Sequence, residues 1–266
     1  MDMETLKRRG LVMLGCGKMG SAMLEGWLKG ALDPGDVFVI DPNPSEWLQG
    51  TGVTINGGLP EQPGLLIVAV KPQMMDDALP QVGQFGGGGT LVLSVAAGVT
   101  IARYEKTFGG GTPVIRAIPN TPAAVGRGVT AIVANDEGAP SLDLAEHLLN
   151  AVGQTVRLES EDQMDAVTGV SGSGPAYVFH MIECLAKAAE AEGLSPDLAM
   201  ALAKATVGGA GQLAEDSPKA PSTLREDVTS PNGTTQAGLD VLMAELPDLM
   251  KRTVAAAAAR SRELGA

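Results

Sequence analysis

The sequence contains little cysteine, few aromatic side chains and no long hydrophobic run. Its two cysteines, Cys16 and Cys184, allow one disulfide at most, so no disulfide framework supports the fold. Cys16 falls in a glycine-rich loop and Cys184 in an apolar helical segment, and we interpret both as reduced thiols of a cytoplasmic protein. Aromatic residues make up 3% of the chain, whereas glycine and alanine are abundant, which favours close helix packing over aromatic-lined recognition grooves.

Targeting segments, membrane spans and basic clusters are also missing from the pattern. The N-terminal MDMETLKRRG lacks the apolar core of a signal peptide, and no charge-free apolar run approaches the roughly 18 residues of a membrane span. The net charge is −12, and without a lysine or arginine cluster we expect no nucleic-acid partner. His147 and His180 each stand without a second histidine or cysteine at ligand spacing, so no metal site is predicted.

The first 159 residues alternate short apolar runs with helical patterns. Runs such as LLIVAV (65–70) and TLVLSV (90–95) are typical of strands that a parallel sheet buries on both faces. This alternation predicts an α/β domain with a Rossmann-like doubly wound sheet over residues 1–159. Further strands are expected at 11–15, 36–41, near Val53, 113–118, 128–134 and 155–159, with helices at 19–28 and about 140–152.

After residue 159 the β-patterns stop and the sequence predicts an all-α domain over 160–266. Ser160, followed by two acidic residues, is expected to cap its first helix. The segment 176–192 is apolar on more than one face, which in a small domain indicates a subunit interface. Further helices are expected over 196–214 and 236–264, the last interrupted by Pro247.

A glycine-rich loop follows the first predicted strand and opens a helix. It reads Gly15-Cys16-Gly17-Lys18-Met19-Gly20. In such loops the first glycine makes the tight turn, the second lets the backbone approach a pyrophosphate, and the third lets helix and strand pack closely. The helix N-terminus offers its amides to the anion. We interpret all six residues as a dinucleotide-binding loop, with a merely structural turn as the alternative.

Asp41 ends the second predicted strand, about 20 residues beyond this loop. A carboxylate there can accept both hydroxyls of the adenosine ribose and would repel a 2′-phosphate, and no arginine lies within IDPNPSEW to compensate. Asp41 therefore favours NADH over NADPH. Alternatively, Asp41 only caps the turn before Pro42.

Three further motifs, AVKPQ (69–73), SVAAG (94–98) and AIPNTP (117–122), lie where predicted strands end. In an open α/β sheet, ligands bind outside the carboxyl ends of the strands. Asn120, held between two prolines, could order the nicotinamide ribose or carboxamide. For each motif a plain turn is the alternative. The cofactor contacts expected from these motifs are Val70, Lys71, Pro72, Ala96, Ala97 and Asn120.

Six segments, in this order, resemble the Δ1-pyrroline-5-carboxylate reductase family: GCGKMG, AVKPQ, SVAAGVTI, RAIPNTPAAVGRGVT, SGSGPAYVF and LREDVTSPNGTTQAGL. The resemblance covers the chain from about Leu11 to the final helix. It implies hydride transfer from NADPH or NADH to the C=N bond of 1-pyrroline-5-carboxylate, giving L-proline in the last step of proline biosynthesis. It also implies a C-terminal dimerisation domain and a homodimer that can assemble into a decamer of five dimers.

The same resemblance assigns the substrate to the loop TSPNGTT. Backbone amides and hydroxyls there can bind a carboxylate without adding positive charge. Ser230, Gly233, Thr234 and Thr235 are expected to hold the carboxylate and ring, with Thr235 as the catalytic residue beside the ring nitrogen. Because a threonine hydroxyl is a poor acid, we expect the imine to arrive protonated and Thr235 to orient it. Asn232 stands where the family usually has glycine, and asparagine tolerates a left-handed φ better than most residues.

Two other functions compete with this interpretation. A β-hydroxyacid dehydrogenase also joins a dinucleotide domain to a helical one, but it needs a lysine or histidine base, and SGSGPAY offers none before His180. A non-catalytic dinucleotide-binding sensor would need no loop for a carboxylate. Replacing Thr235 by alanine distinguishes the enzyme from the sensor. In the enzyme, imine reduction should fall while cofactor binding is retained.

Overall fold

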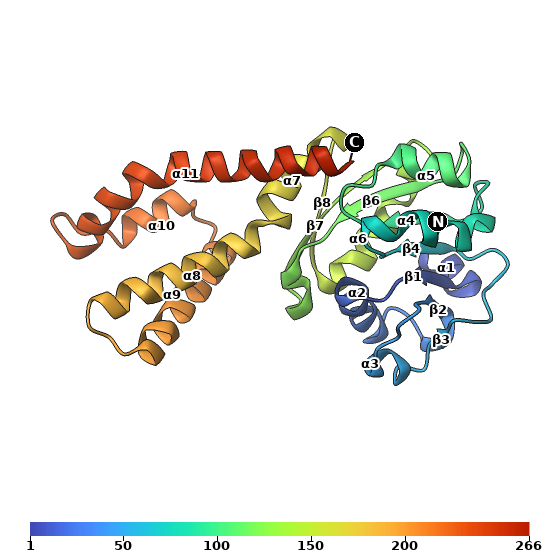
Figure 1. Ribbon diagram of the computed structural model, residues 1–266, viewed down its shortest axis with the longest axis horizontal. Coiled ribbons are helices and arrows are strands. Elements are labelled where there is room, and N and C mark those ends of the chain that lie inside the picture. Colours follow the sequence, from blue (N-terminus) through green and yellow to red (C-terminus); the bar gives the residue numbers. More distant parts are fainter. Residues whose placement is uncertain (266) are drawn as a thin grey trace. The chain divides into compact units, whose positions relative to one another are not determined.

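The computed structural model describes residues 1–265 and divides into two compact units (Figure 1). Unit 1 comprises Met1–Gly172 together with the last turns of the C-terminal helix, from Ala257 on. Unit 2 comprises Ser173–Ala256. A domain boundary after residue 159 stays a prediction.

Among the described residues, unit 1 forms one sheet of eight strands in the order β3-β2-β1-β4-β5-β6-β7-β8. Neighbouring strands are parallel except β6 and β7. The first six strands have the order of a dinucleotide-binding Rossmann sheet, which confirms the predicted fold class. The strands are β1 (Leu11–Leu14), β2 (Val37–Ile40), β3 (Thr54–Ile55), β4 (Leu65–Val68), β5 (Leu91–Ser94), β6 (Val114–Ile118), β7 (Gly128–Ala134) and β8 (Gly153–Arg157).

Helices cover both faces of this sheet. Successive side chains of a strand point to opposite faces, so Leu11 packs with α1, α2 and α6, and Val12 packs with α4, η3 and α5. The buried indole of Trp27 donates to the carbonyl of Leu148 at 2.7 Å and joins α2 to α6. The α-helices of unit 1 are α1 (Met3–Arg9), α2 (Lys18–Leu28), α3 (Glu46–Gln49), α4 (Met75–Ala78), α5 (Ile101–Phe108), α6 (Leu142–Leu149) and α7 (Met164–Val167).

Short 3₁₀ segments connect many of these elements, and one π-helix follows α7. The 3₁₀ segments are η1 (Pro34–Asp36), η2 (Pro72–Met74), η3 (Leu79–Phe85), η4 (Thr121–Val125), η5 (Ala139–Ser141), η6 (Asn150–Val152) and η7 (Glu161–Gln163). The π-helix η8 spans Thr168–Gly172.

Unit 2 consists of helices, namely α8 (Gly174–Ala191), α9 (Pro196–Asp216), α10 (Pro221–Asp227) and the part of α11 (Thr234–Gly265) before Ala257. The predicted interruption at Pro247 is wrong, because α11 continues through it. Proline removes one N–H donor, and the backbone bonds on both sides keep the helix continuous.

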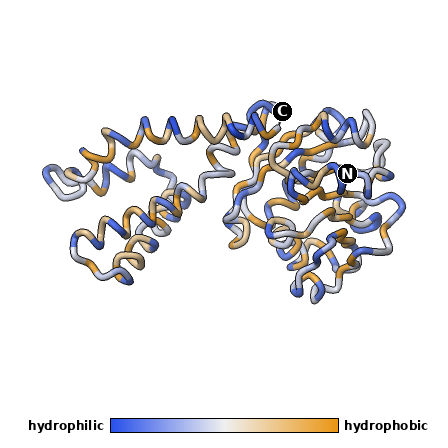
Figure 2. Tube along the Cα trace, viewed as in Figure 1, coloured by the Kyte–Doolittle hydropathy of each residue, from blue (hydrophilic) through white to orange (hydrophobic). Residues whose placement is uncertain are grey.

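The core of unit 2 is small. It consists of Ala186, Ala199 and Ala203, whose short side chains let α8 and α9 approach closely. Large hydrophobic side chains instead stay exposed, and Figure 2 shows hydrophobic residues along α8, α9 and α11. Those exposed on α8 and α9 are Val178, Phe179, Met181, Leu185, Leu198, Leu202 and Leu213. Unit 2 therefore presents apolar faces that another protein surface can bury.

Two kinds of site are not found in the part of the chain that the structure describes. None of the helices within residues 1–265 is long and apolar enough to cross a membrane. Over the same residues, three or more histidine, cysteine, aspartate or glutamate side chains do not gather as a metal site would require.

Candidate active site

The cofactor motifs meet at one edge of the sheet. Leu14 of β1 pairs in register with Ile40 of β2 and with Val68 of β4, and Val68 pairs with Ser94 of β5. The loops that begin after these strands therefore start at the same level. The strand order reverses between β1 and β4, which is where dinucleotides bind in sheets of this kind.

The three glycines of the loop after β1 have three different surroundings. Gly15 has a φ of +85°, and a Cβ there would lie 2.7 Å from Val70 Cγ1, so only glycine fits. A Cβ on Gly20 would lie 3.1 Å from the carbonyl oxygen of Gly15. A Cβ on Gly17 would meet no protein atom within 4 Å. The first and third glycines thus serve the fold, and the space beside the second is open to a ligand.

Gly17 is also the N-cap of α2, and it has no side chain with which to bond the first amides of that helix. The first turn of α2 contains no acidic residue, and Lys18 is exposed. Uncapped amides and the positive end of the helix dipole favour a bound anion. This loop and helix start fit the pyrophosphate of a dinucleotide.

Cys16 is held inside the loop rather than presented to solvent. Its side chain is buried, and this burial raises the pKa of the thiol, so the thiolate form is disfavoured. Its backbone N–H donates to Asp41 Oδ2 at 2.7 Å. We infer a structural role for the thiol and a link between the loops after β1 and β2.

Asp41 is fixed on several sides. Besides the bond from Cys16, its Oδ1 accepts from the backbone N–H of Asn43 at 2.8 Å. Its own backbone N–H and carbonyl are both bonded by the side chain of Asn56, at 2.9 and 2.7 Å. Asn56 adopts a φ of 55°. The sequence analysis did not single out Asn56, although an asparagine before two glycines is a signal for such a turn.

The loops after β4 and β5 present the remaining predicted cofactor contacts. Lys71 and Pro72 are exposed, and Val70, partly buried, packs against Gly15. Ala97 is exposed, whereas Ala96 is buried and its N–H donates to Ser94 Oγ at 3.2 Å. These residues lie at the sheet edge described above, and their contact with a cofactor stays a prediction.

Asn120 lies after β6 and is 8% exposed. Its Oδ1 accepts from the N–H of Val129 at 2.9 Å, and its Nδ2 donates to the carbonyl of Ser171 at 3.1 Å. The amide is thus rigid, as the flanking prolines indicate, but it bonds to the protein's own backbone. Its contact with the nicotinamide half of a cofactor stays a prediction.

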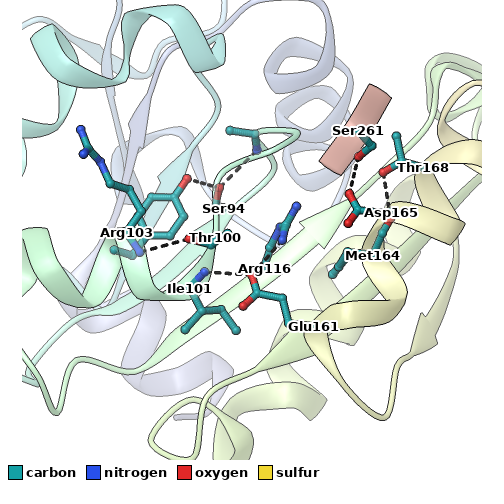
Figure 3. A network of polar contacts seen from close by, with 12 residues as sticks. Ser94, Thr100, Ile101, Arg103, Arg116, Glu161, Met164, Asp165, Thr168 and Ser261 are labelled. Carbon is teal, nitrogen blue, oxygen red and sulfur yellow. Dashed lines mark hydrogen bonds and ion pairs between the residues drawn. The ribbon is translucent and has the colours of Figure 1, made fainter. Parts of the chain in front are cut away.

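The sequence analysis did not predict a polar network, mostly buried, that joins β6, the start of α5 and η7 (Figure 3). Arg116 of β6 donates from Nη1 to Glu161 Oε1 at 2.8 Å, and the same oxygen accepts from the N–H of Ile101 at 2.9 Å. Ser160 is the N-cap residue of η7, with acidic residues in the first turn as predicted, but its side chain makes no capping hydrogen bond. A charged residue in the apolar run PVIRAI is the signal that could have revealed the network.

Beside this pair, Ser94 Oγ and the hydroxyl of Tyr104 share a hydrogen bond of 2.5 Å. Burial raises the pKa of Tyr104 to about 12, so the phenol stays protonated over the physiological range. Since Ser94 also accepts from Ala96, this bond fixes the start of the loop after β5.

The predicted substrate residues lie together in unit 2, where α11 begins. Gly233 N–H donates to the carbonyl of Ser230 at 3.0 Å and closes a turn, and Thr234 is the first residue of α11. The side chains of Ser230, Thr234 and Thr235 are exposed, and their hydroxyls have no hydrogen-bond partner within residues 1–265. The first turn of α11 carries no acidic residue. Free hydroxyls at a helix N-terminus suit a carboxylate.

Asn232 occupies the left-handed region in this loop, with a φ of 60°. We expect Asn232→Gly to leave thermal stability and the KM for the substrate nearly unchanged, because glycine adopts this φ freely. Asn232→Val should strain the turn by about 1–2 kcal/mol and raise the KM, because β-branched residues avoid positive φ. Thermal unfolding and steady-state kinetics check both. Equal KM values for the two variants would show that the turn does not shape the substrate loop.

Comparison with known proteins agrees with this arrangement. Residues 161–264 match the family model for pyrroline-5-carboxylate reductase dimerisation, and residues 11–98 match that for NADP oxidoreductase, coenzyme F420-dependent. A pyrroline-5-carboxylate reductase from Synechocystis sp. is 45% identical over 203 residues, which cover 76% of this chain and 75% of that protein. The chain belongs to the pyrroline-5-carboxylate reductase family.

Solved structures of the family share the whole fold. The pyrroline-5-carboxylate reductase of Coxiella burnetii aligns with a TM-score of 0.90 at 32% identity, covering 97% of this chain and 99% of that one. The Plasmodium falciparum pyrroline carboxylate reductase, solved with NADP bound, aligns with a TM-score of 0.84 at 26% identity, covering 98% of this chain and 100% of that one. The predicted activity, an NAD(P)-dependent oxidoreductase acting on pyrroline-5-carboxylate, is thereby confirmed over the dehydrogenase and sensor alternatives.

Proposed function

We propose that the chain makes L-proline with a cofactor bound on unit 1 and a substrate carboxylate bound on the Ser230–Thr235 loop of unit 2. The observation that carries this is the cluster of free hydroxyls at the start of α11. Such a cluster can bind a carboxylate, and the segment Ser230–Thr235 holds no histidine, lysine or carboxylate that could activate a hydroxyl as a nucleophile. Reduction of a C=N bond that is already protonated needs no such nucleophile.

The cofactor half of the site is assigned to the edge of the sheet. The amides at the start of α2 and the open space beside Gly17 would hold the pyrophosphate, and Asp41 would face the adenosine ribose. The loops after β4, β5 and β6 would then lie along the nicotinamide half. When bound, the reduced nicotinamide supplies the hydride.

The substrate half orients the imine. Amides at the start of α11, with the hydroxyls of Ser230 and Thr234, would hold the carboxylate. The hydroxyl oxygen of Thr235 would accept a hydrogen bond from the protonated ring nitrogen. Holding the ring at a fixed angle to the cofactor supplies much of the rate, because the reaction becomes effectively unimolecular.

The cofactor preference rests on Asp41. The Plasmodium falciparum relative was solved with NADP, which shows that the family fold can hold the 2′-phosphate. In this chain Asp41 is fixed by Cys16 and Asn43, so its carboxylate cannot easily turn away from a 2′-phosphate. We therefore propose a preference for NADH over NADPH.

The active unit is proposed to be a homodimer. Exposed apolar faces on α8 and α9, together with the match of residues 161–264 to a dimerisation family, support dimer formation through unit 2. Each active site would take its cofactor from one subunit and part of its carboxylate loop from the other. We further propose that five dimers assemble into a decamer. The enzyme is proposed to act in the cytoplasm, where reduced nicotinamide is supplied.

Turnover of pyrroline-5-carboxylate, followed by nicotinamide absorbance in parallel with NADH and NADPH, tests this function. The proposal expects turnover with both, and a higher kcat/KM with NADH. No turnover with either cofactor, while the cofactor still binds, would refute the reaction. A higher kcat/KM with NADPH would refute only the role of Asp41.

Thr235→Ala should lower kcat about 10- to 100-fold and leave cofactor affinity unchanged, because one hydrogen bond to the charged ring is lost. Thr235→Ser keeps the hydroxyl and should retain most of the activity. Steady-state kinetics and cofactor titration measure both effects. If Thr235→Ala turned over imine as fast as Thr235→Ser, the catalytic assignment would be wrong.

A further inference from the structure

An ion pair whose arginine is buried and whose glutamate is partly exposed bonds the end of the loop Val95–Thr100, which joins β5 to α5 and is called here the β5–α5 loop. The side chain of Arg116 is 5% exposed and bonds Glu161 at 2.8 Å. Arg116 is also the register partner of Ser94, the last residue of β5, so it stands beside the point where the loop begins. These contacts lie within unit 1 and are drawn in Figure 3.

Polar side chains hold both ends of the β5–α5 loop through hydrogen bonds to its backbone. At its start, the N–H of Ala96 donates to Ser94 Oγ, which is bonded to Tyr104. At its end, the N–H of Ile101 donates to Glu161 Oε1, the same oxygen that receives Arg116. Arg116 fixes Glu161, and Glu161 fixes the end of the loop.

Ala96 and Val99 pack this loop into the core of unit 1, but the loop is not packed on every side. A pocket of about 140 Å³, partly open to solvent, lies beside it, lined by Gly98, Thr100, Arg116, Asp165, Arg262 and Gly265. The loop therefore has room to shift toward the pocket if its polar contacts are removed.

Stability alone does not explain the pair. Burying the guanidinium of Arg116 costs desolvation free energy, and an ion pair with the partly exposed Glu161 offsets little of that cost. Here the Nε of Arg116 is buried and has no hydrogen-bond partner among the described residues, which is an added cost. What the pair supplies is a fixed acceptor for one backbone N–H, and thus a defined loop position.

We propose that Arg116 and Glu161 are positioning residues that hold the β5–α5 loop where it contacts the nicotinamide half of the cofactor. With Asp41 at the end of β2 on the adenosine side, the strand order places β4, β5 and β6 on the nicotinamide side. Ala96 and Ala97 are the loop's predicted contacts. This inference rests on the proposed function of the loop as a cofactor contact.

The test compares Arg116→Met, the double variant Arg116→Met/Glu161→Leu, and Glu161→Gln. For each variant we would measure the thermal unfolding midpoint. The Kd values of NADH and NADPH and the kcat and KM values are then measured at a temperature well below that midpoint. Arg157→Met is the control, because Arg157 is likewise a strand arginine that forms ion pairs, with Asp143 and Glu146, but it is exposed on β8. In the control, cofactor affinity is expected to stay at the wild-type value.

The single variant Arg116→Met should lose stability and weaken cofactor binding about 10- to 100-fold. The double variant should regain stability through apolar packing but not affinity, because no acceptor for Ile101 N–H remains. Glu161→Gln keeps that acceptor and should stay within about threefold of the wild-type affinity despite lower stability. In each, the KM for the imine should change less than that for the cofactor.

Affinity that follows the unfolding midpoint across all variants would overturn the positioning role, since a purely structural pair predicts that result. Unchanged affinity in a folded Arg116→Met variant would overturn it as well. If wild-type protein bound neither NADH nor NADPH, the proposed function itself would fail, and this inference with it. If the wild-type protein binds the cofactor and the variants bind it equally well, the positioning role is refuted but the proposed function is not.

Discussion

Replacing Gly17 by valine is expected to abolish binding of NADH and NADPH without changing the fold. Gly17 has a φ of −73° and a ψ of −161°, which any residue can adopt, and a Cβ there meets no protein atom within 4 Å. The protein therefore does not need a glycine at this position for its own structure. The second glycine of such a loop is needed for the close approach of the pyrophosphate. Cofactor affinity should fall more than about 100-fold, because the branched side chain occupies the space of a bound anion.

Two matched variants make this result interpretable. Gly30→Ala also adds a side chain in open space, and it should leave both affinity and stability unchanged. Gly15→Ala should lower the unfolding midpoint and the affinity together, because its φ is +85° and its Cβ would collide with Val70. Titration of each folded variant with NADH measures the effect. Wild-type affinity in Gly17→Val would place the pyrophosphate away from this loop.

Turnover is expected to disappear when the dimer is split. Met181 and Leu185 lie one turn apart on α8 and are 50% and 42% exposed in the single chain. Charged residues there would not disturb the small alanine core of unit 2, but they would oppose burial against a second subunit. The double variant Met181→Glu/Leu185→Glu should therefore be monomeric and lack measurable activity, while its unit 1 still binds the cofactor.

Light scattering for mass, cofactor titration and imine turnover on the same sample provide the measurement. Loss of cofactor binding along with turnover would point to misfolding, so this prediction is judged only on variants that bind NADH as wild type does. Full activity in such a monomer would refute a site shared between subunits.

Much of the fold could be predicted because the signals are local. The run GVTAIVA predicts a strand over 128–134, and β7 has those bounds. The helix α4 was missed because its 4 residues are too short for a clear apolar period. The helix α5 was missed although its buried residues, Ile101, Tyr104 and Phe108, recur at helical spacing. At Pro247 the rule that proline interrupts a helix failed, since α11 is long enough to continue beyond one missing bond.

The candidate site likewise has a part that the sequence predicts and a part that only the structure reveals. The glycine loop and TSPNGTT are contiguous, so their residue types alone indicate anion binding. Asn56 lies 15 residues from Asp41, and Glu161 lies 45 residues from Arg116, so no local pattern connects either pair. Only the fold brings them together. A lone arginine in an apolar strand shows that a partner must exist, but not which carboxylate it is.

Complementation between two impaired variants tests the central claim, that cofactor residues of one subunit and the carboxylate loop of the other make one site. Gly17→Val is expected to lack cofactor binding, and Thr235→Ala lacks the hydroxyl proposed to orient the imine. In a mixed dimer, a shared site would combine intact Gly17 from one chain with intact Thr235 from the other. Dissociating and reassociating equal amounts should restore about a quarter of wild-type turnover, since half the dimers are mixed and each has one intact site of two. Activity that stays at the level of the separate variants, in samples shown to contain mixed dimers, would place both halves on the same chain and contradict the account.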